Sequence, residues 1–112
     1  MHYKKINLSM EQILQTVAKR VVDIGYVDDV ISIEENVING KLHYIILSNA
    51  YFNGKYYIKQ SILSYDDIFD LVSETYELDG YYVEKIDFDI KDDIIGYNFY
   101  LIETLSRKLK RT

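Results

Sequence analysis

The sequence predicts a small α+β fold, in which two helices pack on an antiparallel sheet of about five strands. Three observations support this prediction. Apolar residues recur at helical spacing in two segments, strand-like apolar patterns fill most of the rest, and Asn-Gly dipeptides separate three of the strand-like segments. The expected element order is α-β-β-β-α-β-β. We expect a single α+β domain over residues 1–112, without internal repeats or linkers.

The first helix is predicted over residues 10–24. Ser9 and Gln12 have the spacing of a capping box, in which each side chain bonds to a backbone amide of the first turn. Apolar residues then recur every three or four positions, with charged residues on the other side. Gly25 follows at the place where helices commonly end in a left-handed residue, so the helix is expected to stop there.

Three strands are predicted over residues 30–38, 41–51 and 55–63. The dipeptides between them, Asn39-Gly40 and Asn53-Gly54, favour two-residue hairpin turns because both turn residues need a positive φ. The middle strand would therefore lie between two partners. Its continuous apolar run indicates that it is covered on both faces.

The register of these three strands has two solutions. With two-residue turns, the apolar residues of 30–38 share a face with Tyr44 and Ile46, whereas those of 55–63 share a face with Ile45 and Leu47. Either the middle strand is buried on both faces, or one hairpin contains a β-bulge that changes the register. Both alternatives stay open at this point.

The second helix is predicted over residues 65–78. Ser64 and Asp67 have capping-box spacing, and Gly80 would end the helix. A strand over residues 82–90 follows, in which apolar and charged residues alternate as they do on an edge strand with one solvent face.

The last segment has two interpretations. Its many Ile, Tyr and Phe residues favour a strand over residues 94–103, whereas leucines spaced four residues apart suit a C-terminal helix. We favour the strand, followed by a basic tail, residues 106–112, that is frayed or helical.

The composition is that of a soluble globular protein, with 112 residues, 48% of them hydrophobic, and a net charge of −5. The absence of cysteine excludes disulfides, thiolate zinc sites and cysteine nucleophiles. No apolar run approaches the roughly 18 residues that a membrane span needs, so we expect no membrane association and a cytoplasmic location. Abundant Ile, Tyr, Lys and Asn, which have AT-rich codons, indicate an AT-rich bacterium, phage or mobile element as the source.

No residue pattern predicts catalysis or a cofactor. The glycines are isolated, so the chain has no phosphate-binding loop, and two histidines are too few for a metal site or an acid–base pair. An EF-hand loop starting at Asp87 would fail at its fifth, sixth and twelfth positions, which hold Lys91, Asp92 and Asn98. We therefore expect no enzyme activity, no metal site and no cofactor.

Acidic residues concentrate between Asp66 and Asp93, where eleven of them accompany two lysines. Such a segment is either a solvated surface or a face that binds a basic surface of another protein. Direct binding of nucleic acid is unfavourable because counterion release requires cations on the protein. The acidic candidates for partner binding are Asp66, Asp67, Asp70, Glu74, Glu77, Asp87, Asp89, Asp92 and Asp93.

Tyrosine is also abundant, with 12 residues that concentrate in the predicted strands and at their ends. Tyrosine is enriched at protein interfaces, although strand propensity and codon bias also explain its abundance. The aromatic candidates for partner binding are Tyr56, Tyr57, Tyr81 and Tyr82. Because Tyr56 and Tyr57 are adjacent in a strand, they point to opposite faces, and we expect at least one to be exposed.

These observations favour a non-catalytic protein-binding module, such as a small acidic inhibitor or immunity-type protein that binds a basic, nucleic-acid-binding surface of its partner. One alternative is a structural module that forms a homodimer through a free sheet edge such as residues 94–103. A second alternative is a small enzyme or ligand-binding domain with a pocket that holds His43 and a buried carboxylate.

Overall fold

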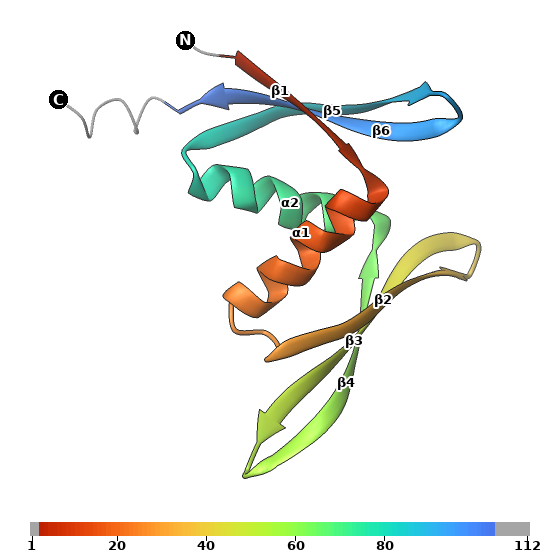
Figure 1. Ribbon diagram of the computed structural model, residues 1–112, viewed down its shortest axis with the longest axis vertical. Helices are drawn as coiled ribbons and strands as arrows, with labels where there is room; N and C mark the ends of the chain where they lie inside the picture. Colours follow the sequence, from red (N-terminus) through yellow and green to blue (C-terminus); the bar gives the residue numbers. More distant parts are fainter. Residues whose placement is uncertain (1–2, 105–112) are drawn as a thin grey trace, which may run out of the picture. The chain divides into compact units, whose positions relative to one another are not determined.

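The computed structural model describes residues 3–104 as an α+β protein of two helices and six strands (Figure 1). The elements are β1 (Tyr3–Ser9), α1 (Met10–Asp23), β2 (Asp29–Ile38), β3 (Lys41–Phe52), β4 (Lys55–Ser64), α2 (Tyr65–Leu78), β5 (Tyr81–Lys91) and β6 (Ile94–Glu103). The α+β class and the seven elements expected from the sequence are confirmed, and their ends differ from the expected ones by at most one residue. The predicted basic tail, residues 106–112, lies outside the described residues.

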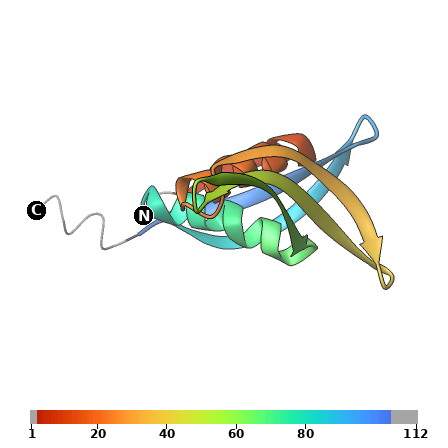
Figure 2. The same ribbon diagram turned by 90° about the horizontal axis from the view of Figure 1, so that it is seen from below.

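The strands form two antiparallel sheets, so the prediction of one sheet of about five strands is wrong (Figure 1; Figure 2). One sheet has the strand order β1-β6-β5 and the other has the order β2-β3-β4. The strand β1 was not predicted from the sequence. It has seven residues, two of which are lysines, and only Ile6 and Leu8 are apolar residues that point toward the core. With β1 present, β6 has a partner on each side and forms a sheet without help from β2, β3 or β4.

Each sheet belongs to its own compact unit. The terminal unit comprises the described residues up to Ile13 and from Val72 onward, and it contains the β1-β6-β5 sheet. The central unit comprises Leu14–Leu71 and contains the β2-β3-β4 sheet. The chain therefore passes from one unit to the other within each helix.

The element order repeats along the chain, because β1-α1-β2-β3 in the first half has the same order as β4-α2-β5-β6 in the second half. Both helices have 14 residues and follow a capping box that begins at Ser9 or Ser64. Gly25 and Gly80 follow the two helices with φ values of 78° and 90°. The sequence did not reveal this structural repeat, because most of the equivalent residues differ in identity.

The two halves exchange their first strands. β1 of the first half pairs with β6, and β4 of the second half pairs with β3, in the same register. The matching pairs are Lys4–Leu101 and Lys59–Ser48, Ile6–Phe99 and Ser61–Ile46, and Leu8–Tyr97 and Leu63–Tyr44. Both hairpins also shift register at the same place, between Val30 and Ser32 in one and between Val83 and Lys85 in the other.

A lysine–tyrosine contact recurs at equivalent positions of the two halves. Lys59 Nζ lies 3.6 Å from the ring centroid of Tyr26, and Lys4 Nζ lies 5.7 Å from that of Tyr81. In each unit the lysine comes from the exchanged first strand, and the tyrosine follows the helix and its glycine. The recurrence of a specific side-chain contact shows that the repeat extends beyond element order.

The core lies on one face of each sheet. In the terminal unit, the ring centroids of Phe99 in β6 and Tyr76 in α2 are 5.8 Å apart, which identifies the face that α2 covers. Alternate residues of the two middle strands, β3 and β6, are buried on the core face of their own sheet. These residues occupy equivalent positions in the two halves, and they are Tyr44, Ile46 and Ser48 in β3 and Tyr97, Phe99 and Leu101 in β6. The buried helix residues are Ile13, Val17 and Val21 in α1 and Ile68, Phe69 and Val72 in α2.

A β-bulge at Ile31 settles the register of the central sheet. Ile33 pairs with buried Ile46, whereas the bulge removes Ile31 from that face and leaves it exposed. The apolar residues of β4 lie on the opposite face, as the turn geometry predicted, and Ile58 and Ile62 are exposed in the described part of the chain. The expectation that β3 is covered on both faces is therefore wrong for the described residues.

Candidate functional site

Four of the acidic candidates lie along one side of α2. Asp66, Asp70, Glu74 and Glu77 follow helical spacing, and all four are exposed. The helix contains neither lysine nor arginine. At 1.5 Å per residue the row extends over about 16 Å. We call these four residues the acidic stripe.

Three other acidic candidates take part in caps and turns. Asp67 Oδ2 accepts a hydrogen bond from Ser64 N at 2.9 Å, while Asp67 N donates to Ser64 Oγ at 3.1 Å. Asp92 and Asp93 form the β5–β6 turn with φ values of 53° and 63°. Aspartate tolerates such a turn better than most residues because its short polar side chain can bond to nearby backbone. These three residues therefore have local structural roles.

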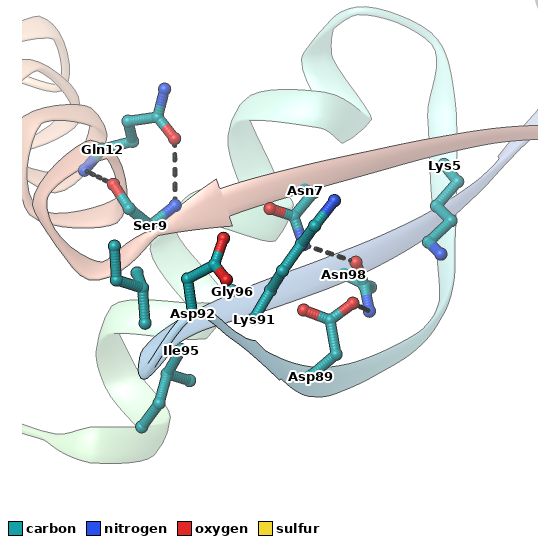
Figure 3. Close-up of a pocket in the computed structure, with 11 residues that line it drawn as sticks. Lys5, Asn7, Ser9, Gln12, Asp89, Lys91, Asp92, Ile95, Gly96 and Asn98 are labelled. Carbon is teal, nitrogen blue, oxygen red and sulfur yellow. Dashed lines mark hydrogen bonds between the residues drawn. The ribbon is translucent and has the colours of Figure 1, made fainter.

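Asp87 and Asp89 belong to a hydrogen-bond network on the face of the terminal sheet opposite Phe99. Its centre is Asn98, which is 3% exposed. Asn98 Nδ2 donates to Asp87 Oδ1 at 2.9 Å. It also donates to Asp89 Oδ2 at 3.2 Å, and Asn98 Oδ1 accepts from Asn7 Nδ2 at 2.7 Å (Figure 3). The network therefore links all three strands of the terminal sheet through side chains.

The charge of Asp87 is stabilised within this network. The hydrogen bond from Asn98 holds the pKa of Asp87 below its ordinary value of 3.8, and Lys85 and Tyr100 lower it further against a raising effect of partial burial. Lys85 Nζ lies 3.4 Å from Asp87 Oδ2, and Tyr100 Oη donates to Asp87 Oδ1 at 3.4 Å. Asp87 thus has a cationic partner within its own sheet.

A hollow of about 520 Å³ opens on the same face (Figure 3). Gly96 shapes it, because a Cβ at this position would lie 2.6 Å from Asn7 Nδ2. The charged side chains of its lining are of both signs, namely Lys5, Lys91, Asp89 and Asp92. Among residues 3–104, no group of three or more His, Asp or Glu side chains is placed to hold a metal ion.

The combination on which the enzyme alternative depends, His43 beside a buried carboxylate, is not found among the described residues. His43 lies in the central unit, outside the hollow, and its Nδ1 is 2.9 Å from the Lys41 carbonyl oxygen. The buried polar side chains of the described chain belong to Ser48, Ser61 and Asn98, so no carboxylate is buried with a histidine.

The four tyrosine candidates fall into two pairs, one in each unit. Tyr56 and Tyr57 are both exposed, which confirms that at least one of them faces solvent, and the ring centroids of Tyr56 and Tyr51 are 4.9 Å apart. Tyr82 is exposed, whereas Tyr81 is half-buried beside Lys4.

Two features of the sheets were not foreseen from the sequence. Residues 94–103, suggested as a free edge for dimerisation, form the middle strand β6, so that suggestion is wrong. Asn98 was not predicted as part of any site, although a polar residue between Tyr97 and Phe99 in an apolar strand is a signal that could have identified it.

Within residues 3–104, neither helix combines the length and the apolar character that a membrane span requires. Comparisons with protein-family models, with curated proteins and with solved structures find no match for this chain. A functional proposal therefore rests on the residues of this chain.

Proposed function

We propose that the protein is a non-catalytic binding module whose acidic stripe binds a basic surface of another protein. The observation that supports this proposal is the arrangement of Asp66, Asp70, Glu74 and Glu77 on one exposed side of a helix that has no basic residue. Because the helix is already ordered, binding through it costs little conformational entropy. Like charges gathered on one surface also accelerate encounter with a basic partner.

The partner chemistry that suits the stripe is a basic groove that otherwise binds nucleic acid. Such grooves attract phosphates through lysine and arginine, and a row of carboxylates about 6 Å apart on a rigid helix offers a comparable line of negative charge. A small acidic inhibitor or immunity-type protein acts in this way, and the AT-rich composition favours a bacterium, phage or mobile element as its source.

The test compares two variants of equal net charge. In the first, Asp66→Lys, Asp70→Lys and Glu74→Lys reverse the charge of the stripe. In the control, Asp23→Lys, Asp28→Lys and Asp29→Lys reverse three exposed acidic residues around the α1–β2 connection. Tagged wild type captures its partner from a low-GC bacterial lysate, and biolayer interferometry then measures association of that partner with each variant at low and high salt.

We expect the stripe variant to associate at least about 10-fold more slowly at low salt, with a weaker salt dependence, while the control keeps near wild-type kinetics. Equal losses in the two variants would mean that only net charge matters. Unchanged binding by the stripe variant would overturn the proposal.

A further inference from the structure

The face of the central sheet opposite Tyr44 and Ile46 carries six apolar side chains, of which Ile45 and Leu47 are half-buried and the other four are exposed. We call it the open face of the central sheet. Its apolar residues are Ile45, Leu47 and Tyr51 in β3 and Tyr56, Ile58 and Ile62 in β4, and the polar residues Asn49 and Gln60 lie between them. The exposed fractions are 56% for Tyr51, 73% for Tyr56, 67% for Ile58 and 54% for Ile62. The core lies on the other face, so these side chains contribute little to it.

The terminal sheet provides an internal control for this composition. Its equivalent face carries polar residues, and the pair Asn7–Asn98 occupies the place that the pair Ile62–Ile45 occupies in the central sheet. Because the strand registers match, the fold itself does not require apolar residues on this face. The apolar open face of the central sheet therefore needs a separate explanation.

Charged residues flank the open face along its β2 edge. The residues of β2 that pair with Ile45, Leu47 and Asn49 are Glu34, Ser32 and Asp29, so two carboxylates border the apolar group and none lies within it. Interface cores are depleted of charge and enriched in aromatic residues, and the Tyr51–Tyr56 ring pair fits that composition. Two chains of net charge −5 can therefore approach through this face with little direct repulsion.

We propose that a second copy of this chain covers the open face, so that two central sheets pack face to face in a two-fold dimer. The six side chains expose on the order of 600 Å² of mainly apolar surface, close to the ~800 Å² that each partner buries in a standard interface. A two-fold axis makes one self-complementary face sufficient for closure. The dimer supplies the second cover of β3 that its continuous apolar sequence predicts.

Sedimentation equilibrium of the full chain, from about 1 to 100 µM, tests this proposal. We expect wild type to shift with concentration toward twice its mass of 13.3 kDa. The double variant Ile58→Asn/Ile62→Asn is expected to sediment as a monomer with an unchanged circular dichroism spectrum. Its second substitution places an amide at the position equivalent to Asn7 in the terminal sheet. The control variant is Ile90→Asn. Ile90 lies in β5, and its exposed fraction of 64% is similar to the 67% of Ile58. We expect this variant to dimerise as wild type does.

A milder variant keeps the test informative if the double variant does not fold. Tyr56→Ser near the exposed end of β4 is expected to weaken dimerisation at least about 10-fold without unfolding the sheet. Wild type that stays monomeric over the whole range would overturn the proposal, because another protein or solvent would then cover the face. Dimerisation that is lost in Ile90→Asn but kept in both open-face variants would also overturn it.

Discussion

The two sheets of this protein share strand order and register but differ on the face away from the core. In the terminal sheet that face holds the buried amide of Asn98, bonded to Asn7, Asp87 and Asp89. In the central sheet the equivalent of the Asn7–Asn98 pair is Ile62–Ile45, and neighbouring isoleucine and tyrosine side chains are exposed. The buried face is apolar in both sheets and specifies the fold, whereas the opposite face is polar in one sheet and largely apolar in the other.

The largest effect is expected on the buried faces, where the two sheets should behave alike. Phe99→Ala in the terminal sheet and Ile46→Ala in the central sheet remove equivalent, fully or almost fully buried side chains. We expect losses of about 4 and about 3 kcal/mol of unfolding free energy, respectively, because each leaves a cavity and Phe99 is larger. Urea denaturation measures both, and a cost near zero for either would break the equivalence of the two cores.

An intermediate effect is expected where the sheets differ. Asn98→Ala should lower the unfolding free energy by about 2 kcal/mol, since the network partners lose a buried hydrogen-bonding group. Asn7→Ile with Asn98→Ile, which copies the Ile62–Ile45 pair, should cost less than about 1 kcal/mol because the new side chains pack across the strands. If the double variant is the less stable of the two in urea, the polar network is essential to the terminal sheet.

The smallest effect concerns pH. The pKa of Asp87 is lowered in the folded protein, chiefly by Asn98, so the stabilisation by its carboxylate is present above the unfolded value near 3.8 and is lost as pH falls through the folded value. We therefore expect wild type to lose stability on acidification below about pH 4, and Asp87→Asn to lose less over the same range. Urea midpoints at pH 6 and pH 3 measure this difference. Parallel acid losses in the two proteins would show that other carboxylates dominate.

Local structure was well predicted by the sequence because its signals lie within a few residues. The capping boxes at Ser9 and Ser64 start the helices, and the Asn-Gly dipeptides form turns with positive φ at Asn39 and Asn53. The exposure of the acidic stripe also followed from helical spacing. Each of these features depends on side chains and backbone groups that are close in sequence.

The pairing of β1 with β6 was not predicted, because it joins residues far apart in sequence, whereas the pairing of β3 with its two neighbours followed from the turns between them. Nothing local in β1 indicates that Ile6 pairs with Phe99, and its lysines resemble those of a solvated terminus. The bulge at Ile31 was likewise left open by the sequence, because it changes which residues of β2 lie on the same face as Ile46 of β3. The network of Asn98 could not be predicted without this pairing, since its partners come from both neighbouring strands.

The exchange of first strands has a consequence for the order of folding during synthesis. The central unit, Leu14–Leu71, contains all the partners of its sheet in one continuous stretch of chain, so it can form before translation ends. The terminal sheet needs β6, which leaves the ribosome long after β1 and after the whole of the central unit. At typical rates of 5–20 residues per second, β1 waits for about 5–20 s, and closure of this long loop makes the terminal sheet the slower to fold.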